Sequence, residues 1–191
     1  MATRITIIGA GPGGYVAAVS AARLGAEVTV IEQENVGGTC LNWGCIPSKI
    51  MITTAALLEN FHKADTFGVD LPGDSNGGPR VNMAKLMARK EAVITTQAKG
   101  IHDLFQHHKV RHLAGSAFIK EPGKVRVRSA HGEETEALWD RLIIATGTQP
   151  LEIPSLPFDG KAVLSSNHAL CLDSVPESIL ILGGGVIGCE F

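Results

Sequence analysis

The chain has 191 residues, of which 45% are hydrophobic and 19% are charged, and its formal net charge is −2. This composition is that of a folded globular protein. The sequence has no run of basic residues, so nothing in it indicates a surface that binds nucleic acid. No apolar run approaches the roughly 20 residues that a membrane-spanning helix needs, and no charged-then-apolar signal segment opens the chain. We therefore expect a cytoplasmic protein with neither nucleic acid nor membrane as a partner.

The first part of the chain has the pattern of a strand–helix–strand unit in a parallel sheet. Short β-branched runs predict buried strands, and the alanine-rich stretch between them predicts a helix. In chain order we expect a strand at residues 5–8, a glycine-rich loop at 9–14, a helix at about 15–24, and a strand at 27–31 that leads into Glu32.

The glycine-rich loop carries the spacing G-x-G-x-x-G at Gly9, Gly11 and Gly14. Gly9 allows a tight turn, Gly11 lets backbone N–H groups approach a pyrophosphate, and Gly14 lets the helix pack closely on the strand. The phosphates would lie at the amino end of the helix, and Glu32 would accept hydrogen bonds from ribose hydroxyls. The motif predicts a dinucleotide site but does not separate a flavin from a nicotinamide cofactor.

Four residues separate Cys40 from Cys45, and Pro47 follows at a position suited to the first turn of a helix. The positive end of that helix would favour a thiolate at Cys45, so the pattern predicts a redox-active pair. A structural disulfide, half of a zinc site, and two small buried hydrophobic residues are the alternatives. A structural zinc site needs four ligands, and Cys171 and Cys189 stand apart from each other and from any Cys/His cluster.

Helical periodicity predicts helices at residues 46–63 and about 82–107, and turn-forming residues at 71–80 predict an exposed loop between them. Three histidines lie near the end of the second helix, with a lysine and an arginine between them and no carboxylate or cysteine beside them. We interpret them as a solvated basic stretch and not as a metal site. These histidines are His107, His108 and His112.

From about residue 110 to residue 144, apolar and polar residues alternate, and Pro-Gly and His-Gly pairs supply turns. The alternation predicts a small antiparallel meander that ends in a buried parallel strand at 142–144. Ala145, Thr146 and Gly147 follow that strand. A glycine turn at the carboxyl end of a core strand is where open α/β sheets bind ligands.

A second glycine cluster repeats the fingerprint near the end of the chain. An apolar strand expected at residues 178–182 leads into Gly183, Gly185 and Gly188. The chain stops at Phe191, three residues into the helix that this motif should open, and a βαβ unit cut there cannot bury its own faces. We therefore expect the chain to be a fragment of a longer protein.

These motifs together resemble the pyridine nucleotide–disulfide oxidoreductases. The resemblance rests on the run Gly-Gly-Thr-Cys-Leu-Asn-Trp-Gly-Cys-Ile-Pro-Ser-Lys at residues 37–49, on both glycine fingerprints and on the Ala-Thr-Gly turn, and it covers essentially the whole chain. It implies a three-layer α/β fold with a parallel sheet, in a Rossmann-like FAD-binding domain at residues 1–150. That domain would hold a two-helix insertion at about 45–108 and the meander at about 110–141. Residues 151–191 would be a linker and the first strand of a Rossmann-like NAD-binding domain.

The resemblance also implies roles for individual residues. Cys40 would be the interchange thiol that attacks the substrate, and Cys45 the thiolate stacked on the flavin. Lys49 would stand beside the flavin N5, paired with Glu190. The FAD site would comprise Gly9, Gly11, Pro12, Gly13, Gly14, Glu32, Gly38, Thr39, Cys40, Lys49, Gly115, Ala117, Ala145, Thr146 and Gly147. The NAD site would begin with Gly183, Gly185, Val186, Ile187, Gly188 and Glu190.

Within the family, the ending Cys-Ile-Pro-Ser-Lys is typical of the branch that acts on lipoamide. The implied reaction oxidises protein-bound dihydrolipoamide to lipoamide with FAD, a redox disulfide between Cys40 and Cys45, and NAD+ as acceptor. The implied partners are the lipoyl domain of a 2-oxoacid dehydrogenase or glycine cleavage complex, and a second copy of the full-length protein. A glutathione or mercuric reductase of the same superfamily, a truncated FAD-binding module without turnover, and a protein that binds only nicotinamide are the alternatives. The family's acid–base His-Glu pair would lie beyond Phe191, so we expect the chain alone to bind FAD at best and to turn over poorly.

Overall fold

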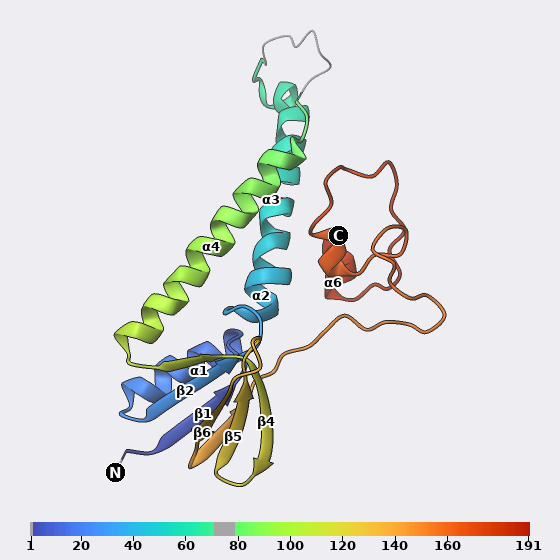
Figure 1. The fold of residues 1–191 in the computed structure, drawn as a ribbon. Coiled ribbons are helices and arrows are strands. Elements are labelled where there is room, and N and C mark those ends of the chain that lie inside the picture. The colour runs from blue at the N-terminus through green and yellow to red at the C-terminus, as the bar shows by residue number, and fades with distance from the viewer. Residues whose placement is uncertain (1, 71–78) are drawn as a thin grey trace. The chain divides into compact units, whose positions relative to one another are not determined.

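The computed structural model describes residues 2–70 and 79–191 (Figure 1). The exposed loop predicted at 71–80 therefore lies mostly outside the described residues. Within these ranges no helix is both long enough and apolar enough to cross a lipid bilayer.

Contacts between residues divide the chain into two compact units. The first comprises the residues up to Trp43 together with Ile94–Gln149, and the second comprises Gly44–Val93 together with Pro150–Phe191. One boundary between the units falls near residue 150, and the expected domains at residues 1–150 and 151–191 stay a prediction. The predicted helical insertion, however, is divided between the two units.

A four-stranded parallel sheet forms the centre of the first unit, with the strand order β3-β2-β1-β7. The strands are β1 (Arg4–Ile8), β2 (Glu27–Glu32), β3 (Arg111–Ala114) and β7 (Arg141–Ile144). β1 pairs in parallel with β2 on one side and with β7 on the other, so the predicted parallel strands are confirmed. Ile7, Val30 and Ile31 are at most 1% exposed, which is the burial that a parallel sheet gives its central strands.

β7 is an edge strand of this sheet, and its burial differs from the prediction. Ile143 pairs with Ile7, but Ile144 at the end of the strand is 65% exposed. The strand is only partly buried because none of the described strands pairs with its outer edge.

Helix α1 (Pro12–Arg23) connects β1 to β2 and starts three residues earlier than predicted. Pro12 stands in its first turn, where the fixed φ of proline suits a helix and the missing N–H removes no hydrogen bond. The chain leaves the helix at Gly25, whose φ of +88° is typical of a helix stop. A short second helix, α2 (Gly38–Trp43), follows β2.

The antiparallel meander consists of β4 (Ser116–Glu121), β5 (Lys124–Arg128) and β6 (Glu134–Leu138), side by side in that order (Figure 1). The alternation from residue 110 suggested that β3 belongs to the meander. The prediction is wrong on this point, because β3 pairs in parallel with β2. A period of two is common to both kinds of sheet, so the alternation cannot choose the partner strand. On the inner face, Val125, Val127 and Ala137 pack with Ile31 of β2 in one buried cluster.

In the second unit, helix α3 (Cys45–His62) begins at the second cysteine, close to the predicted start. Helix α4 (Met83–His107) runs from the second unit into the first and continues through Gly100. The other helical segments of this unit are η1 (Ala64–Phe67), α5 (Ser166–Ala169) and α6 (Val186–Glu190). Lys90 of α4 is buried, and its Nζ donates to the Leu170 carbonyl at 2.9 Å, which ties the end of α5 to α4.

The strand predicted at residues 178–182 is not formed. Ile179, Leu180 and Leu182 are 53%, 94% and 71% exposed, and the stretch pairs with none of the described strands. A parallel strand is stable only when neighbouring strands satisfy its backbone groups. The prediction is wrong because an apolar β-branched run cannot form a sheet without a partner.

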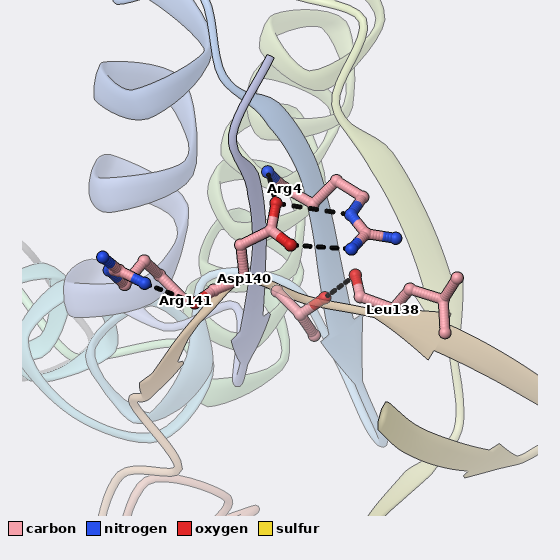
Figure 2. A network of polar contacts seen from close by, with 5 residues as sticks. Arg4, Leu138, Asp140 and Arg141 are labelled. Atoms are coloured by element: carbon pink, nitrogen blue, oxygen red, sulfur yellow. Dashed lines mark hydrogen bonds and ion pairs between the residues drawn. The ribbon is translucent and has the colours of Figure 1, made fainter. Parts of the chain in front are cut away.

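An ion pair joins the start of β1 to the residue that precedes β7 (Figure 2). Arg4 Nη2 lies 2.6 Å from Asp140 Oδ1, and the Arg4 backbone N–H donates to Asp140 Oδ2 at 2.8 Å. The Asp140 N–H donates back to the Arg4 carbonyl at 2.9 Å, and the Thr6 hydroxyl donates to the Leu138 carbonyl at 3.2 Å. The pKa of Asp140 is lowered from 3.8 to about 2, mainly because the Arg4 side chain donates to this carboxylate and to a smaller extent because the Arg4 backbone N–H does so.

We predict that Asp140→Asn lowers the melting temperature at neutral pH and makes the fold less sensitive to acid. A carboxylate with a lowered pKa stabilises the fold above its unfolded pKa, and that contribution is lost as the pH falls from 3.8 towards about 2. The Tm difference between wild type and variant, measured by thermal unfolding, should therefore shrink within this window. Asp103→Asn, which removes an ion pair from the exposed surface of α4, is the matched control. A Tm difference that does not change with pH would contradict the prediction.

Candidate functional site

The first glycine turn lies at the carboxyl ends of β1 and β2. Gly9 has a φ of +100°, which favours glycine, and its N–H donates to the Ile31 carbonyl at 2.8 Å. The Ala10 N–H donates to Glu32 Oε2 at 2.7 Å, and Glu32 Oε1 accepts the Glu34 N–H at 2.9 Å. The acid therefore contacts the glycine turn, and each of its oxygens can accept a further hydrogen bond.

Three stretches of chain, at residues 9–14, 38 and 145, approach one another closely at this turn. A Cβ on Gly14 would lie 1.8 Å from the Gly9 carbonyl oxygen, and a Cβ on Gly9 would lie 2.1 Å from the Ala145 carbonyl oxygen. Gly38 has a φ of +55°, and a Cβ there would lie 2.7 Å from the Gly11 Cα. These distances are far shorter than van der Waals contact, so only glycine fits at Gly9, Gly14 and Gly38.

The amino end of α1 is not capped by a side chain. Its N-cap residue is Gly11, and its first turn contains no acidic residue. The first N–H groups of a helix have no acceptor within the helix, and the helix dipole adds positive potential there. Gly13 is exposed and leaves the backbone accessible. A pyrophosphate group therefore fits this end of the helix.

The turn after β7 contacts the start of α2. Thr39 Oγ1 donates to the Thr148 carbonyl at 3.5 Å. Gly147 has a φ of +75°, and a Cβ on it would lie 3.9 Å from Thr39 Oγ1. The Ala145 N–H donates to the Ile8 carbonyl at 2.8 Å, so Thr146 and Gly147 leave the sheet directly beside the glycine turn.

Gly115 and Ala117 lie where β3 passes into β4. The Gly115 N–H donates to the Glu32 carbonyl at 2.8 Å, and a Cβ on Gly115 would lie 2.4 Å from the Arg128 carbonyl oxygen. Ala117 packs against the buried cluster that contains Val125. The backbone of Gly115 is therefore next to Glu32, whereas the Ala117 side chain belongs to the core.

The second glycine turn has the backbone geometry of the first. Gly183 has a φ of +109°, against +100° for Gly9. The N-cap Gly185 has φ −73° and ψ 178°, against −69° and −176° for Gly11. A Cβ on Gly188 would lie 2.2 Å from the Gly183 carbonyl oxygen, which repeats the close approach of the first turn. The exposed residues that follow this N-cap are Val186 and Ile187.

The two cysteines of the predicted redox pair lie on consecutive helices. Cys40 is half-buried in α2 of the first unit, and Cys45 is exposed as the first residue of α3 in the second unit. Pro47 stands in the first turn of α3, as predicted. A disulfide between Cys40 and Cys45 stays a prediction.

Lys49 and Glu190 form an ion pair within the second unit, which is the pairing that the resemblance implies. The Ser48 hydroxyl lies 3.2 Å from Glu190 Oε2 and 3.3 Å from the Cys45 carbonyl oxygen. The hydrogen bond from Lys49, and to a lesser extent that from Ser48, lowers the pKa of Glu190 below its ordinary value of 4.5. Motif spacing does not identify Ser48, although its place between Pro47 and Lys49 is a signal that could have done so.

His112 differs from the prediction of a solvated basic stretch. Its ring centroid lies 5.4 Å from that of His102 and 5.9 Å from that of Phe105, and its Nε2 is buried without a hydrogen-bond partner in the described chain. The pKa of His112 is lowered below 6.5, mainly by burial and to a smaller extent by charge repulsion from His102. The negative charge of Glu32 raises it in part. His107 is exposed, as predicted, whereas His108 is half-buried. Nowhere in residues 2–70 and 79–191 do three or more His, Cys, Asp or Glu side chains gather where they could hold a metal ion.

The sheet, the crossing helix and the glycine turn define a Rossmann-like α/β protein. The chain belongs to the pyridine nucleotide-disulphide oxidoreductase family, whose model matches residues 3–191. Two dihydrolipoyl dehydrogenases of Bacillus subtilis (strain 168) are 40% and 43% identical to it, each over 98% of this chain and 40% of the relative. The dihydrolipoyl dehydrogenase 2 of Haloarcula marismortui is 41% identical over 98% of this chain and 39% of its own length.

A solved structure is similar to this chain as well. The crystal structure of LpdA from Mycobacterium tuberculosis matches with a TM-score of 0.78 and 27% sequence identity, over 92% of this chain and 38% of that chain. The chain therefore spans about 40% of the length of the relatives that it matches.

We predict that Gly14→Ala destabilises the first unit, whereas Gly13→Ala does not. The new Cβ at residue 14 would lie 1.8 Å from the Gly9 carbonyl, and that overlap should cost about 1–3 kcal/mol. At residue 13 the new Cβ would lie 3.9 Å from the Ala145 Cβ, an ordinary contact, and alanine favours the helix. Urea unfolding of the two variants measures the difference. Equal stability of the two would show that α1 does not depend on this close approach.

We predict that His112 makes the fold less stable at acidic pH. The folded state holds His112 with a lowered pKa, so below 6.5 the unfolded state binds more protons, and stability falls as the pH drops through that value. The groups that face His112 are His102 from α4 and Glu32 from β2. His112→Phe should flatten the fall of Tm between about pH 7 and pH 5, whereas His131→Phe, at an exposed turn, should not. The same slope for wild type and His112→Phe would refute this account.

Proposed function

We propose that this chain is the flavin- and dithiol-bearing part of an oxidoreductase that oxidises protein-bound dihydrolipoamide to lipoamide, with NAD+ as acceptor. The observation that carries the proposal is the combination, in one chain, of an uncapped helix amino end at a glycine turn with two cysteines on the helices that follow. The relatives named dihydrolipoyl dehydrogenase support the choice of substrate.

The residues around the first glycine turn fit FAD. The pyrophosphate would accept hydrogen bonds at the amino end of α1, from the backbone around Gly11, Pro12, Gly13 and Gly14, and Glu32 would accept from the adenosine ribose. When bound, FAD supplies a two-electron carrier between a dithiol and NAD+. The remaining proposed contacts are Gly9, Gly38, Thr39, Cys40, Lys49, Gly115, Ala117, Ala145, Thr146 and Gly147.

The cysteine pair would exchange electrons with the substrate through thiol–disulfide exchange. A substrate thiolate attacks the Cys40 sulfur of a Cys40–Cys45 disulfide, which breaks the S–S bond and releases Cys45 as a thiolate. The second substrate thiolate then attacks the substrate sulfur bound to Cys40, so lipoamide leaves and Cys40 becomes a thiolate. The substrate has lost two electrons and two protons. When Cys40 and Cys45 form the disulfide again, both electrons and one proton would pass on as hydride to the NAD+ acceptor, and the other proton would go to solvent.

Lys49 would place a positive charge near the flavin, where it stabilises negative charge that develops on reduction. The ammonium group of Lys49 forms an ion pair with one carboxylate oxygen of Glu190, and the Ser48 hydroxyl donates a hydrogen bond to the other oxygen. The NAD site would begin at the second glycine turn with Gly183, Gly185, Val186, Ile187, Gly188 and Glu190. The geometry shared by the two glycine turns supports a second dinucleotide there.

The proposed partners follow from the substrate. A lipoyl domain of a 2-oxoacid dehydrogenase or glycine cleavage complex would present the dithiol, and two copies of the full-length protein would form a homodimer. We place this protein in the cytoplasm, where a reversible cysteine pair is more often catalytic than structural.

The test is NADH formation from dihydrolipoamide by the complete protein that contains this chain, together with its visible absorption spectrum. We expect flavin absorption and NADH formation in the wild type. In Cys40→Ser we expect retained flavin and a loss of at least about a thousandfold in turnover, because no disulfide can form. Cys171→Ser, at an exposed cysteine outside the proposed machinery, is the matched control and should keep its activity.

Other outcomes identify other functions. Turnover with glutathione or mercuric ion, and none with dihydrolipoamide, would assign the protein to another branch of the family. Flavin binding with no turnover on any of these substrates would leave a FAD-binding module. Unchanged turnover in Cys40→Ser would refute the dithiol mechanism.

A further inference from the structure

Asn42 lies between the two cysteines in sequence, and its side-chain amide bonds two backbone carbonyls. Its Nδ2 donates to the Val36 carbonyl at 3.1 Å and to the Gly38 carbonyl at 2.9 Å. The Gly38 bond lies within α2, whereas the Val36 bond reaches back to the chain before that helix. Asn42 is half-buried, so both bonds are partly shielded from water.

The turn that Asn42 closes joins α2 to the first glycine turn. Gly37 and Gly38 have φ of +90° and +55°, and the Gly37 N–H donates to the Ala10 carbonyl at 2.8 Å. A Cβ on Gly37 would lie 2.3 Å from the side chain of Leu41, the buried residue of α2, which is 4% exposed. The position of α2 therefore depends on this turn.

We propose that Asn42 is a positioning residue that sets where Cys40 lies relative to the first glycine turn. The inference rests on the proposed function, in which Cys40 must lie within reach of both the substrate dithiol and Cys45. Asn42 acts by holding the six-residue helix α2 to the turn before it.

The chemistry of the two bonds makes the donor indispensable. Both partners of Asn42 are carbonyl oxygens, which only accept, so the side chain must supply N–H groups. An aspartate has the same shape but sets a carboxylate oxygen against two carbonyl oxygens. A serine hydroxyl in a helix bonds the carbonyl four residues earlier, so it keeps the Gly38 bond and loses the Val36 bond.

Three variants of the complete protein therefore separate a donor role from a space-filling role. If the donor matters, the defect should increase in the order Asn42→Ser, Asn42→Ala, Asn42→Asp. If only the volume matters, the isosteric Asn42→Asp should be the mildest of the three. Asn60→Asp, at an exposed position of α3, makes the same change of charge and is the matched control.

Three readouts are needed. The first is the rate at which iodoacetamide alkylates Cys40 after reduction, measured by mass spectrometry of the peptide that contains Cys40. The others are the amount of bound flavin, and kcat and KM with dihydrolipoamide. We expect Asn42→Asp to lower kcat about tenfold or more, since small displacements of a reacting group cost that much. Flavin content and KM for NAD+ should stay at wild-type values. The Cys40 alkylation rate should change in the same graded order.

Each outcome decides one of the two proposals. A wild-type protein that does not oxidise dihydrolipoamide refutes the proposed function, while the alkylation series still tests Asn42. An active wild type whose three Asn42 variants all match it in Cys40 alkylation and kcat overturns the positioning role, as does a series in which Asn42→Asp is mildest. Should Asn42→Asp fail to fold, the order of Asn42→Ser and Asn42→Ala decides, since equal values in those two overturn the inference.

Discussion

The close approach of helix α1 to the Gly9 carbonyl is the contact on which the first unit depends. Since a Cβ on Gly14 would lie 1.8 Å from that oxygen, the helix can pack on β1 only with glycine there. The amino end of the helix then lies at the carboxyl edge of the sheet, where Glu32 binds the Ala10 N–H. Gly38 reaches the same place and brings α2, with its cysteine, to the turn.

The second glycine turn shows which part of this arrangement is local. Gly183 and Gly185 repeat the backbone angles of the first turn although residues 178–182 form no strand. The turn therefore needs only its glycines and the helix that starts at Val186. A strand needs a neighbour, because its N–H and C=O groups bond to an adjacent strand and not along their own strand.

The same distinction separates what could be predicted from the sequence from what could not. Helix α3 starts where Pro47 and the apolar period place it, and the acid at Glu32 reaches the glycine turn, because these features are encoded over short distances. The parallel pairing of β3 with β2 depends on a partner far along the chain, and this pairing sets His112 opposite Val30. Roles of the site residues toward a cofactor follow from the family resemblance and stay predictions, since motif spacing identifies the residues but not their ligands.

The bond between Arg4 and Asp140 has a consequence for how the chain folds. The two residues are 136 positions apart, and β1, made first, pairs with β7, made last among the strands of this sheet. Contacts of such separation form late, because the entropy of closing the loop opposes them. During synthesis β1 therefore keeps one unpaired edge until residue 144 is available, and such an edge pairs readily with other chains. The sheet is therefore complete only once β7 has been made, and growing chains that end before β7 expose an unpaired edge of β1.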